Sequence, residues 1–225
     1  MKREPIIPGV RLFLGFQLVC WLAFLCLDIS GEIGTPSDKA LACSGGIKYL
    51  TIFVCYCWRQ GKKDRKLEQA QHLVLFADFF LLFTRHVNAG IFCFLGVHGC
   101  YRKYLETSRK SRRRIICRDV FLWVSLGAVV LVAEIWESIR DMGTLTLATM
   151  YTGIAIRNLS LAWKKERNGL FFRALLLLLL CDVNLVIYNL SGYEQGWAGV
   201  AMWLFYLPSQ VLVTLTAILE QEKTG

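Results

Sequence analysis

The sequence predicts an all-α integral membrane bundle of eight transmembrane helices with both termini in the cytosol. Three observations predict this fold class. Hydrophobic residues make up 55% of the 225-residue chain and charged residues only 19%, whereas soluble domains carry about 25% charged residues. The apolar residues form blocks separated by charge clusters, and the longer blocks approach the roughly 20 residues that a membrane-crossing helix needs. Finally, Lys and Arg fall mostly on one side of the predicted bundle.

Eight apolar blocks predict eight spans within one transmembrane domain, residues 1–225. The spans are expected at about residues 10–27, 47–58, 71–83, 89–104, 120–136, 144–163, 172–188 and 196–219. The first block follows Lys2, Arg3 and Arg11, as in a signal peptide, but no small-residue cleavage site closes it, so a retained span is expected. The second and third blocks are short and interrupted by polar residues. The seventh contains six consecutive leucines, 175–180.

The distribution of Lys and Arg predicts the orientation of these spans. With the N-terminus inside, the cytosolic segments carry 21 of the 26 Lys and Arg residues and the outside loops carry three. Cytosolic loops are enriched in positive residues, so this split supports both the span count and the direction. The densest basic run, Arg109–Arg114, is expected to be a cytosolic loop that fixes topology, with an anionic-lipid or nucleic-acid contact as the alternative.

The orientation explains the net charge of +9 without a nucleic-acid partner, and none is expected. The sequence predicts a multi-pass protein of the cytoplasmic membrane, or of the endoplasmic reticulum in a eukaryote, with the lipid bilayer as its surroundings. One internal similarity stands out, because residues 73–83 and 177–187 each place an Asp in the middle of an apolar helix. A parallel four-plus-four duplication and chance similarity are both compatible with it.

No metal or cofactor is expected from the residues. The nine cysteines show neither a paired framework nor zinc-type spacing. The three histidines, His72, His86 and His98, form no HxxxH or HExxH pair, which disfavours a membrane zinc hydrolase. The chain also lacks a GxSxG elbow, which weakens a serine-lipase interpretation.

Two carboxylates inside apolar blocks are the main catalytic candidates. A charge in the hydrocarbon core costs about 2.5–3.5 kcal/mol on insertion scales, so such residues are functional candidates by default. Asp78 and Asp182 are expected at similar depth, where desolvation and like charge favour one protonated and one ionised carboxyl. That pair suits general acid–base hydrolysis. The alternative is that each Asp only joins helices through hydrogen bonds.

Five other polar residues are candidates for binding a substrate or tuning the carboxyls: Lys48, His98, Tyr101, Tyr151 and Gln210. Lys48 is expected at the outer start of the second span, where it either pairs with Asp78 or Asp182 or extends to the outer headgroups. His98 and Tyr101 share a helix face at i, i+3. Tyr151 shares a face of the sixth span with Asn158.

Six short patterns occur in order on these spans, within residues 40–217. They are Gly46–Leu50, Phe76–Leu81, Phe94–Tyr101, Tyr151, Leu180–Asp182 and Phe205–Leu215. With these patterns the chain resembles the lysoplasmalogenase family, which are YhhN-like multi-span membrane proteins. It departs from the family's pattern by lacking the proline after Lys48 and by carrying Ala77, Cys181 and Arg157. These departures bear on substrate preference more than on the fold.

The resemblance implies a hydrolase that cleaves the vinyl ether bond of lysoplasmalogens, giving a fatty aldehyde and a glycerophospho-base. A protonated Asp would protonate the vinyl carbon, and a second, ionised Asp would stabilise the oxocarbenium ion and activate water. We expect Asp78 and Asp182 to share these roles, with the order open. Lys48 and His98 would tune the carboxyls or hold the headgroup phosphate of the lysophospholipid substrate.

The remaining candidates, Tyr101, Tyr151 and Gln210, would orient water or the glycerol hydroxyls. Two other functions fit the same residues. Intramembrane acids with a Lys also describe a proton- or cation-coupled transporter, and a non-catalytic relative would only bind lipid.

Overall fold

The computed structural model describes residues 8–34, 38–60, 64–84, 86–106, 142–165, 169–190 and 196–222. Within these ranges every regular element is helical: α1 (Pro8–Ile33), α2 (Asp38–Arg59), α3 (Arg65–Phe79), η1 (Phe80–Thr84), α4 (Val87–Leu105), α6 (Met142–Lys165), α7 (Leu170–Leu190) and α8 (Gly196–Glu222). The all-α prediction is confirmed for this part of the chain. The predicted span 120–136 and the basic run Arg109–Arg114 lie outside the described residues.

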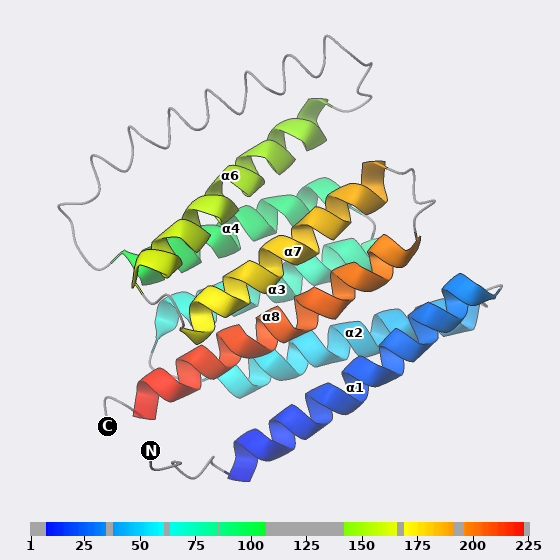
Figure 1. The fold of residues 1–225 in the computed structure, drawn as a ribbon, viewed down its shortest axis with the longest axis horizontal. Coiled ribbons are helices and arrows are strands. Elements are labelled where there is room, and N and C mark those ends of the chain that lie inside the picture. Colours follow the sequence, from blue (N-terminus) through cyan, green and yellow to red (C-terminus); the bar gives the residue numbers. More distant parts are fainter. Residues whose placement is uncertain are drawn as a thin grey trace.

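The long helices pack side by side in two layers. Figure 1 shows α6, α7 and α8 in front and α4, α3 and α2 behind, with α1 along the edge next to α2. Contacts join α1 to both α2 and α8, and α4 to α6, so the layers close on each other at both edges. The helices that carry the candidate residues, α2, α3, α4, α6, α7 and α8, therefore lie together.

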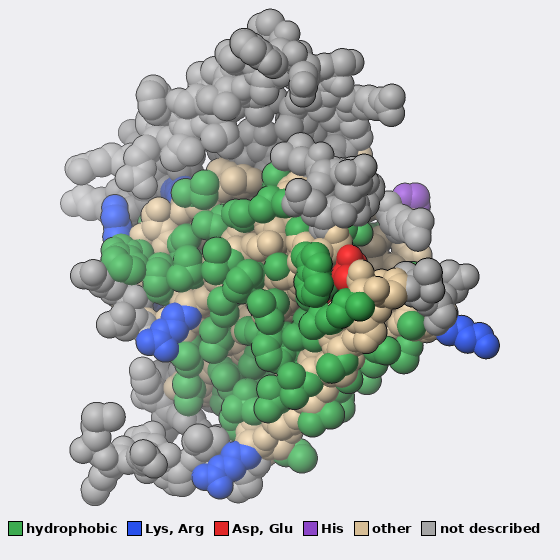
Figure 2. Space-filling view, turned by 45° about the vertical axis from the view of Figure 1, so that its right-hand side comes forward, with side chains coloured by type: hydrophobic (Ala, Val, Ile, Leu, Met, Phe, Trp, Pro, Cys, Tyr) green, Lys and Arg blue, Asp and Glu red, His purple; other side chains and the backbone are tan. Residues whose placement is uncertain are grey.

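Four of the described helices, α1, α2, α7 and α8, are long and apolar enough to cross a membrane. They cover Gly9–Ile33, Lys39–Arg59, Leu170–Tyr188 and Gly196–Leu219. On α1 the side chains of Leu12 and Val19 are 75% and 67% exposed, an arrangement that water disfavours and lipid does not. Figure 2 shows one such face, where hydrophobic side chains cover most of the described surface and Lys and Arg lie near its margins.

The helices α3, α4 and α6 are not among these four. They bury polar side chains against their neighbours, including Gln71 on α3, His98 on α4 and Asn158 on α6, none more than 1% exposed. Part of their low hydropathy therefore comes from polar residues inside the bundle, and part from exposed charges such as those of Arg65, Lys103 and Lys164.

The second helix begins nine residues earlier than predicted, at Asp38 instead of residue 47. The stretch before Lys48 contains small and polar residues that read as a loop. In the structure they are helical and pack on the end of α1, where Ser44 Oγ donates to Asp28 Oδ1 at 2.6 Å. A short side chain with a hydroxyl allows this close approach and satisfies the carboxylate.

The third helix has a defined start and an unusual end. Asp64 is its N-cap, and Oδ1 accepts from the backbone N–H groups of Lys66 at 2.8 Å and Leu67 at 3.4 Å, as expected for an Asp before a helix. After Phe79 the helix widens into the π-helical turn η1. Such turns are rare and frequently lie at functional sites, and this one directly follows the segment that carries Asp78.

The helix contacts are compatible with the duplication. In the first set, α2 packs against α3 and α8, and α3 packs against α4. In a four-plus-four duplication α2 corresponds to α6, α3 to α7, and α4 and α8 to each other. The equivalent contacts are then those of α6 with α7, of α6 with α4, and of α7 with α8. All three of these contacts are present.

Two glycines allow the packing around η1 to be tested. A Cβ on Gly90 would come within 2.6 Å of Leu81 Cγ and Cδ2, whereas one on Gly15 meets nothing within 4 Å. Both Ala substitutions gain about 1 kcal/mol of helix propensity, but overpacking costs about 1–3 kcal/mol. We expect Gly90→Ala to lower the melting temperature in detergent relative to Gly15→Ala. Equal shifts for the two variants would contradict the close α4–η1 contact.

Candidate active site

The carboxylate of Asp78 is buried between α3 and α8. Its side chain is 3% exposed, and the Tyr206 hydroxyl lies 2.9 Å from Oδ1 and 2.7 Å from Oδ2. Asp78 is the fourteenth residue of α3, which places it about 20 Å along the helix from its start. A buried carboxylate needs such a donor, because an unpaired one is very costly in an apolar interior.

The second carboxylate is held in the same way. The Tyr151 hydroxyl lies 2.9 Å from Asp182 Oδ1 and 2.8 Å from Oδ2. Asp182 is the thirteenth residue of α7, about 18 Å along its helix from the start. We call the pairs Asp78–Tyr206 and Asp182–Tyr151 the two Asp–Tyr units. Each unit joins two helices and orients its carboxyl group.

The tyrosine rings of both Asp–Tyr units contact one aromatic ring, that of Phe94. The centroid of the Phe94 ring is 6.2 Å from that of Tyr151 and 6.2 Å from that of Tyr206, both in edge-to-face geometry. The two units are therefore neighbours through the ring of Phe94.

His98 lies against one of the units. Its ring is 4.9 Å from the Tyr151 ring, edge to face, and the side chain is 1% exposed. Asn158 Nδ2 lies 3.3 Å from His98 Nδ1 and donates to the His98 carbonyl oxygen at 2.8 Å. No side chain or backbone group of the described chain bonds to His98 Nε2. That buried nitrogen is therefore available to bind a water molecule or a hydroxyl group.

Tyr101 and Gln210 are the other predicted residues that the structure brings to this site. Tyr101 follows His98 by one helical turn, and their rings are 5.8 Å apart. Its hydroxyl neighbours the side chain of Gln210, whose Oε1 accepts from Gln71 Nε2 at 3.4 Å. All three side chains of this group, Tyr101, Gln210 and Gln71, are fully buried. They extend the site as a polar seam between α3, α4 and α8.

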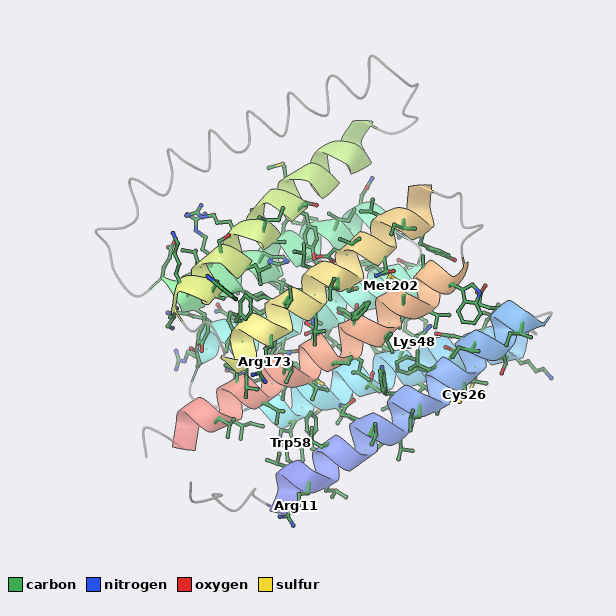
Figure 3. All side chains as sticks on the ribbon, in the orientation of Figure 1. Arg11, Cys26, Lys48, Trp58, Arg173 and Met202 are labelled. Atoms are coloured by element: carbon green, nitrogen blue, oxygen red, sulfur yellow. The ribbon has the colours of Figure 1, made fainter. Side chains whose placement is uncertain are left out.

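Lys48 does not lie where the sequence suggested. It is the eleventh residue of α2, so it lies mid-helix instead of opening a span. The predicted pairing with Asp78 or Asp182 is wrong, since Nζ is 2.8 Å from Asp28 Oδ2. Asp28 seemed to end the first span, but α1 continues to Ile33. Figure 3 labels Lys48 on α2, beside α1 and α8.

Sequence reasoning did not select Tyr206, the donor to Asp78. A signal for it exists, because Trp203, Tyr206 and Gln210 follow one another at spacings of three and four and so share a face of α8. The face shared by Tyr151 and Asn158 is confirmed, with Tyr151 bonding Asp182 and Asn158 bonding His98. Spacing along one helix identified the faces but not the partner helix.

Among the residues that the structure describes, no group of three or more His, Cys, Asp or Glu side chains could hold a metal ion.

Comparison of the chain with protein-family models, with curated proteins and with solved structures gives no match.

Proposed function

We propose that this protein is a membrane-embedded hydrolase of the lysoplasmalogenase type, which cleaves the vinyl ether bond of lysophospholipids. The observation that carries the proposal is the pair of Asp–Tyr units meeting at Phe94. Vinyl ether hydrolysis needs one group that donates a proton to carbon and one that accepts a proton from water. Two carboxyl groups with separate hydrogen-bond donors can adopt these different protonation states.

In the proposed reaction the protonated carboxyl of one unit transfers its proton to the β-carbon of the vinyl ether. The double-bond electrons form the new C–H bond and leave an oxocarbenium ion at the carbon next to oxygen. The ionised carboxylate of the other unit stabilises this cation and takes a proton from the attacking water. In the resulting hemiacetal, the first carboxylate takes the hydroxyl proton while the other carboxyl protonates the glycerol oxygen. The C–O bond to glycerol then breaks, which releases the fatty aldehyde and the glycerophospho-base and returns both carboxyls to their starting states.

Three neighbouring side chains have roles in this proposal. His98 Nε2 binds the attacking water or the hemiacetal hydroxyl, because it lies buried beside Tyr151 and has no hydrogen-bond partner among the residues that the structure describes. Tyr101 and Gln210 orient the glycerol hydroxyls of the substrate. We also propose that the fold has eight spans with both termini in the cytosol, in the cytoplasmic membrane or in the endoplasmic reticulum of a eukaryote.

A proton- or cation-coupled transporter is the second candidate. The buried seam of Gln71, Gln210 and Tyr101 favours it, because polar side chains that cross an apolar interior also form proton pathways. The two functions differ in whether a covalent bond of the lipid breaks. A non-catalytic lipid-binding protein would release no aldehyde and move no ion.

The test is aldehyde release by the purified protein in detergent. A 1-alkenyl lysophospholipid is the substrate, and the matched 1-alkyl lysophospholipid, which has no double bond to protonate, is the control. We expect stoichiometric aldehyde and glycerophospho-base from the alkenyl lipid and neither from the alkyl lipid. If the folded protein releases no aldehyde, but a solute gradient lowers the pH inside liposomes that contain the protein, the result supports the transporter instead.

A further inference from the structure

An ion pair joins α1 and α2 outside the two Asp–Tyr units. Lys48 Nζ lies 2.8 Å from Asp28 Oδ2, and the two side chains are 12% and 11% exposed. Ser44 Oγ donates to the other carboxylate oxygen at 2.6 Å. Apolar side chains of similar size would hold two such helices together as well as a buried ion pair does. A charged pair retained in helices of this kind is therefore a candidate for function.

Two aromatic rings form a wall beside this pair. The Lys48 ammonium lies 5.0 Å from the ring centroid of Trp203 on α8 and 5.7 Å from that of Phe24 on α1. These two rings are 5.8 Å apart in edge-to-face geometry. Aromatic faces at such distances attract ammonium groups, including the quaternary ammonium of choline. The ion pair and the aromatic wall together offer a cation, an anion and a cation-binding surface.

The aromatic wall is connected to the catalytic carboxylate of the proposed function. The rings of Trp203 and Tyr206 are 5.1 Å apart and perpendicular, and the Tyr206 hydroxyl bonds Asp78. In a lysophospholipid the phosphate and the vinyl ether are attached to opposite ends of one glycerol unit. The contacts of Trp203 and Tyr206, three residues apart on α8, therefore connect the ion pair to Asp78 in the order in which a lysophospholipid carries its headgroup and its ether.

We propose that Lys48 and Asp28, with Trp203 and Phe24, form the binding site for a zwitterionic phospholipid headgroup. On binding, the phosphate replaces Asp28 as the partner of Lys48, and the headgroup ammonium is taken by Asp28 and the two rings. Because the protein pair and the headgroup are both zwitterionic, this exchange leaves no charge unpaired. An anionic headgroup lacks the ammonium and leaves Asp28 without a partner. This inference rests on the proposed function for its orientation toward Asp78.

The test measures binding, not turnover, so that it is separate from the test of hydrolysis. The probes are 1-alkyl lysophosphocholine, which cannot be cleaved, 1-alkylglycerol of the same chain, which has no headgroup, and soluble glycerophosphocholine, which has no chain. The variant is Lys48→Gln, and the matched control on the same helix is Lys39→Gln, since the Lys39 side chain is exposed.

We expect Lys48→Gln to weaken binding of the lysophosphocholine at least tenfold and to leave binding of the alkylglycerol unchanged. Lys39→Gln should change neither. Weak binding of glycerophosphocholine that also depends on Lys48 would locate the recognition in the headgroup alone. Equal weakening of both alkyl lipids would show that the pair only joins helices, and unchanged binding of both would equally overturn the proposal.

The unaltered protein provides a test that does not depend on a variant folding. It should bind 1-alkyl lysophosphocholine at least tenfold more tightly than the 1-alkyl lysolipid with a bare phosphate headgroup. Lys48→Arg, which keeps the charge and a donor for phosphate, should retain part of this preference. Equal affinity of the unaltered protein for both headgroups would refute zwitterion recognition, even if the protein hydrolyses vinyl ethers.

Discussion

Replacing Asp78 or Asp182 by Asn is expected to reduce aldehyde release from the alkenyl lysophospholipid to background. An amide cannot donate a proton to carbon or accept one from water, and acid–base groups contribute about 10²–10⁴-fold each. The Asn oxygen can still accept the hydrogen bond that Tyr206 or Tyr151 donates. The variants should therefore fold, and the loss should appear in kcat.

The matched control for these variants is Glu106→Gln. This acid lies at the end of α4, where its Oε1 is 2.8 Å from Arg102 Nε, and it has no part in either Asp–Tyr unit. Initial rates of aldehyde release and melting temperatures are measured for all three variants. If Asp78→Asn or Asp182→Asn folds and keeps more than about a tenth of the parent rate, that carboxyl is not one of the two acid–base groups.

Removing the hydroxyl of Tyr206 or Tyr151 is expected to lower kcat about 10–100-fold. A hydrogen bond to a charged group contributes about 1.5–3 kcal/mol, and about 1.4 kcal/mol corresponds to a tenfold change in rate. The hydroxyl is a hydrogen-bond donor to both carboxylate oxygens in each unit. Tyr206→Phe and Tyr151→Phe remove this donor and keep the ring that packs on Phe94.

The pH–rate profile of these two variants assigns the roles of the units. Loss of a donor to the ionised carboxylate favours its protonated form. In the unit that acts as base, the acidic limb of the profile should move to higher pH. In the unit that acts as acid, the alkaline limb should move to higher pH instead.

The control is Tyr56→Phe, because the Tyr56 hydroxyl bonds His72 at 2.9 Å away from both units. It should leave kcat and both limbs of the profile unchanged. A fall in kcat for Tyr206→Phe or Tyr151→Phe without any movement of the profile would show that the hydroxyl only positions helices.

Apolar runs predicted α7 and α8 well, because a helix that is apolar on most sides gives a long continuous run in the sequence. The leucine run 175–180 lies within α7, and the predicted start of the eighth span at residue 196 matches the start of α8. The start of α2 was missed because residues 38–46 are suited to packing on α1, a property that hydropathy along one segment does not measure. The π-helical turn at 80–84 likewise depends on contacts with α4, such as that between Leu81 and Gly90.

The similar positions of the two aspartates along their helices could be predicted from the sequence, but their partners could not. Distance from the helix start gives the height of Asp78 and Asp182, since each residue rises about 1.5 Å. The rotation of each helix and its neighbours decides which side chain lies opposite at that height. Tyr206 is 128 positions from Asp78, and Lys48 meets Asp28 on the preceding helix because α1 continues beyond the apolar run that suggested its end.

The Asp28–Lys48 ion pair also bears on how the chain enters its membrane. During synthesis α1 emerges first and carries Asp28 without its partner, and α2 follows with Lys48 at its middle. Each lone charge costs about 2.5–3.5 kcal/mol on insertion scales, whereas the paired charges largely offset this cost. The favourable route is insertion of α1 and α2 together as a helical hairpin, which is complete only after residue 59 has left the ribosome.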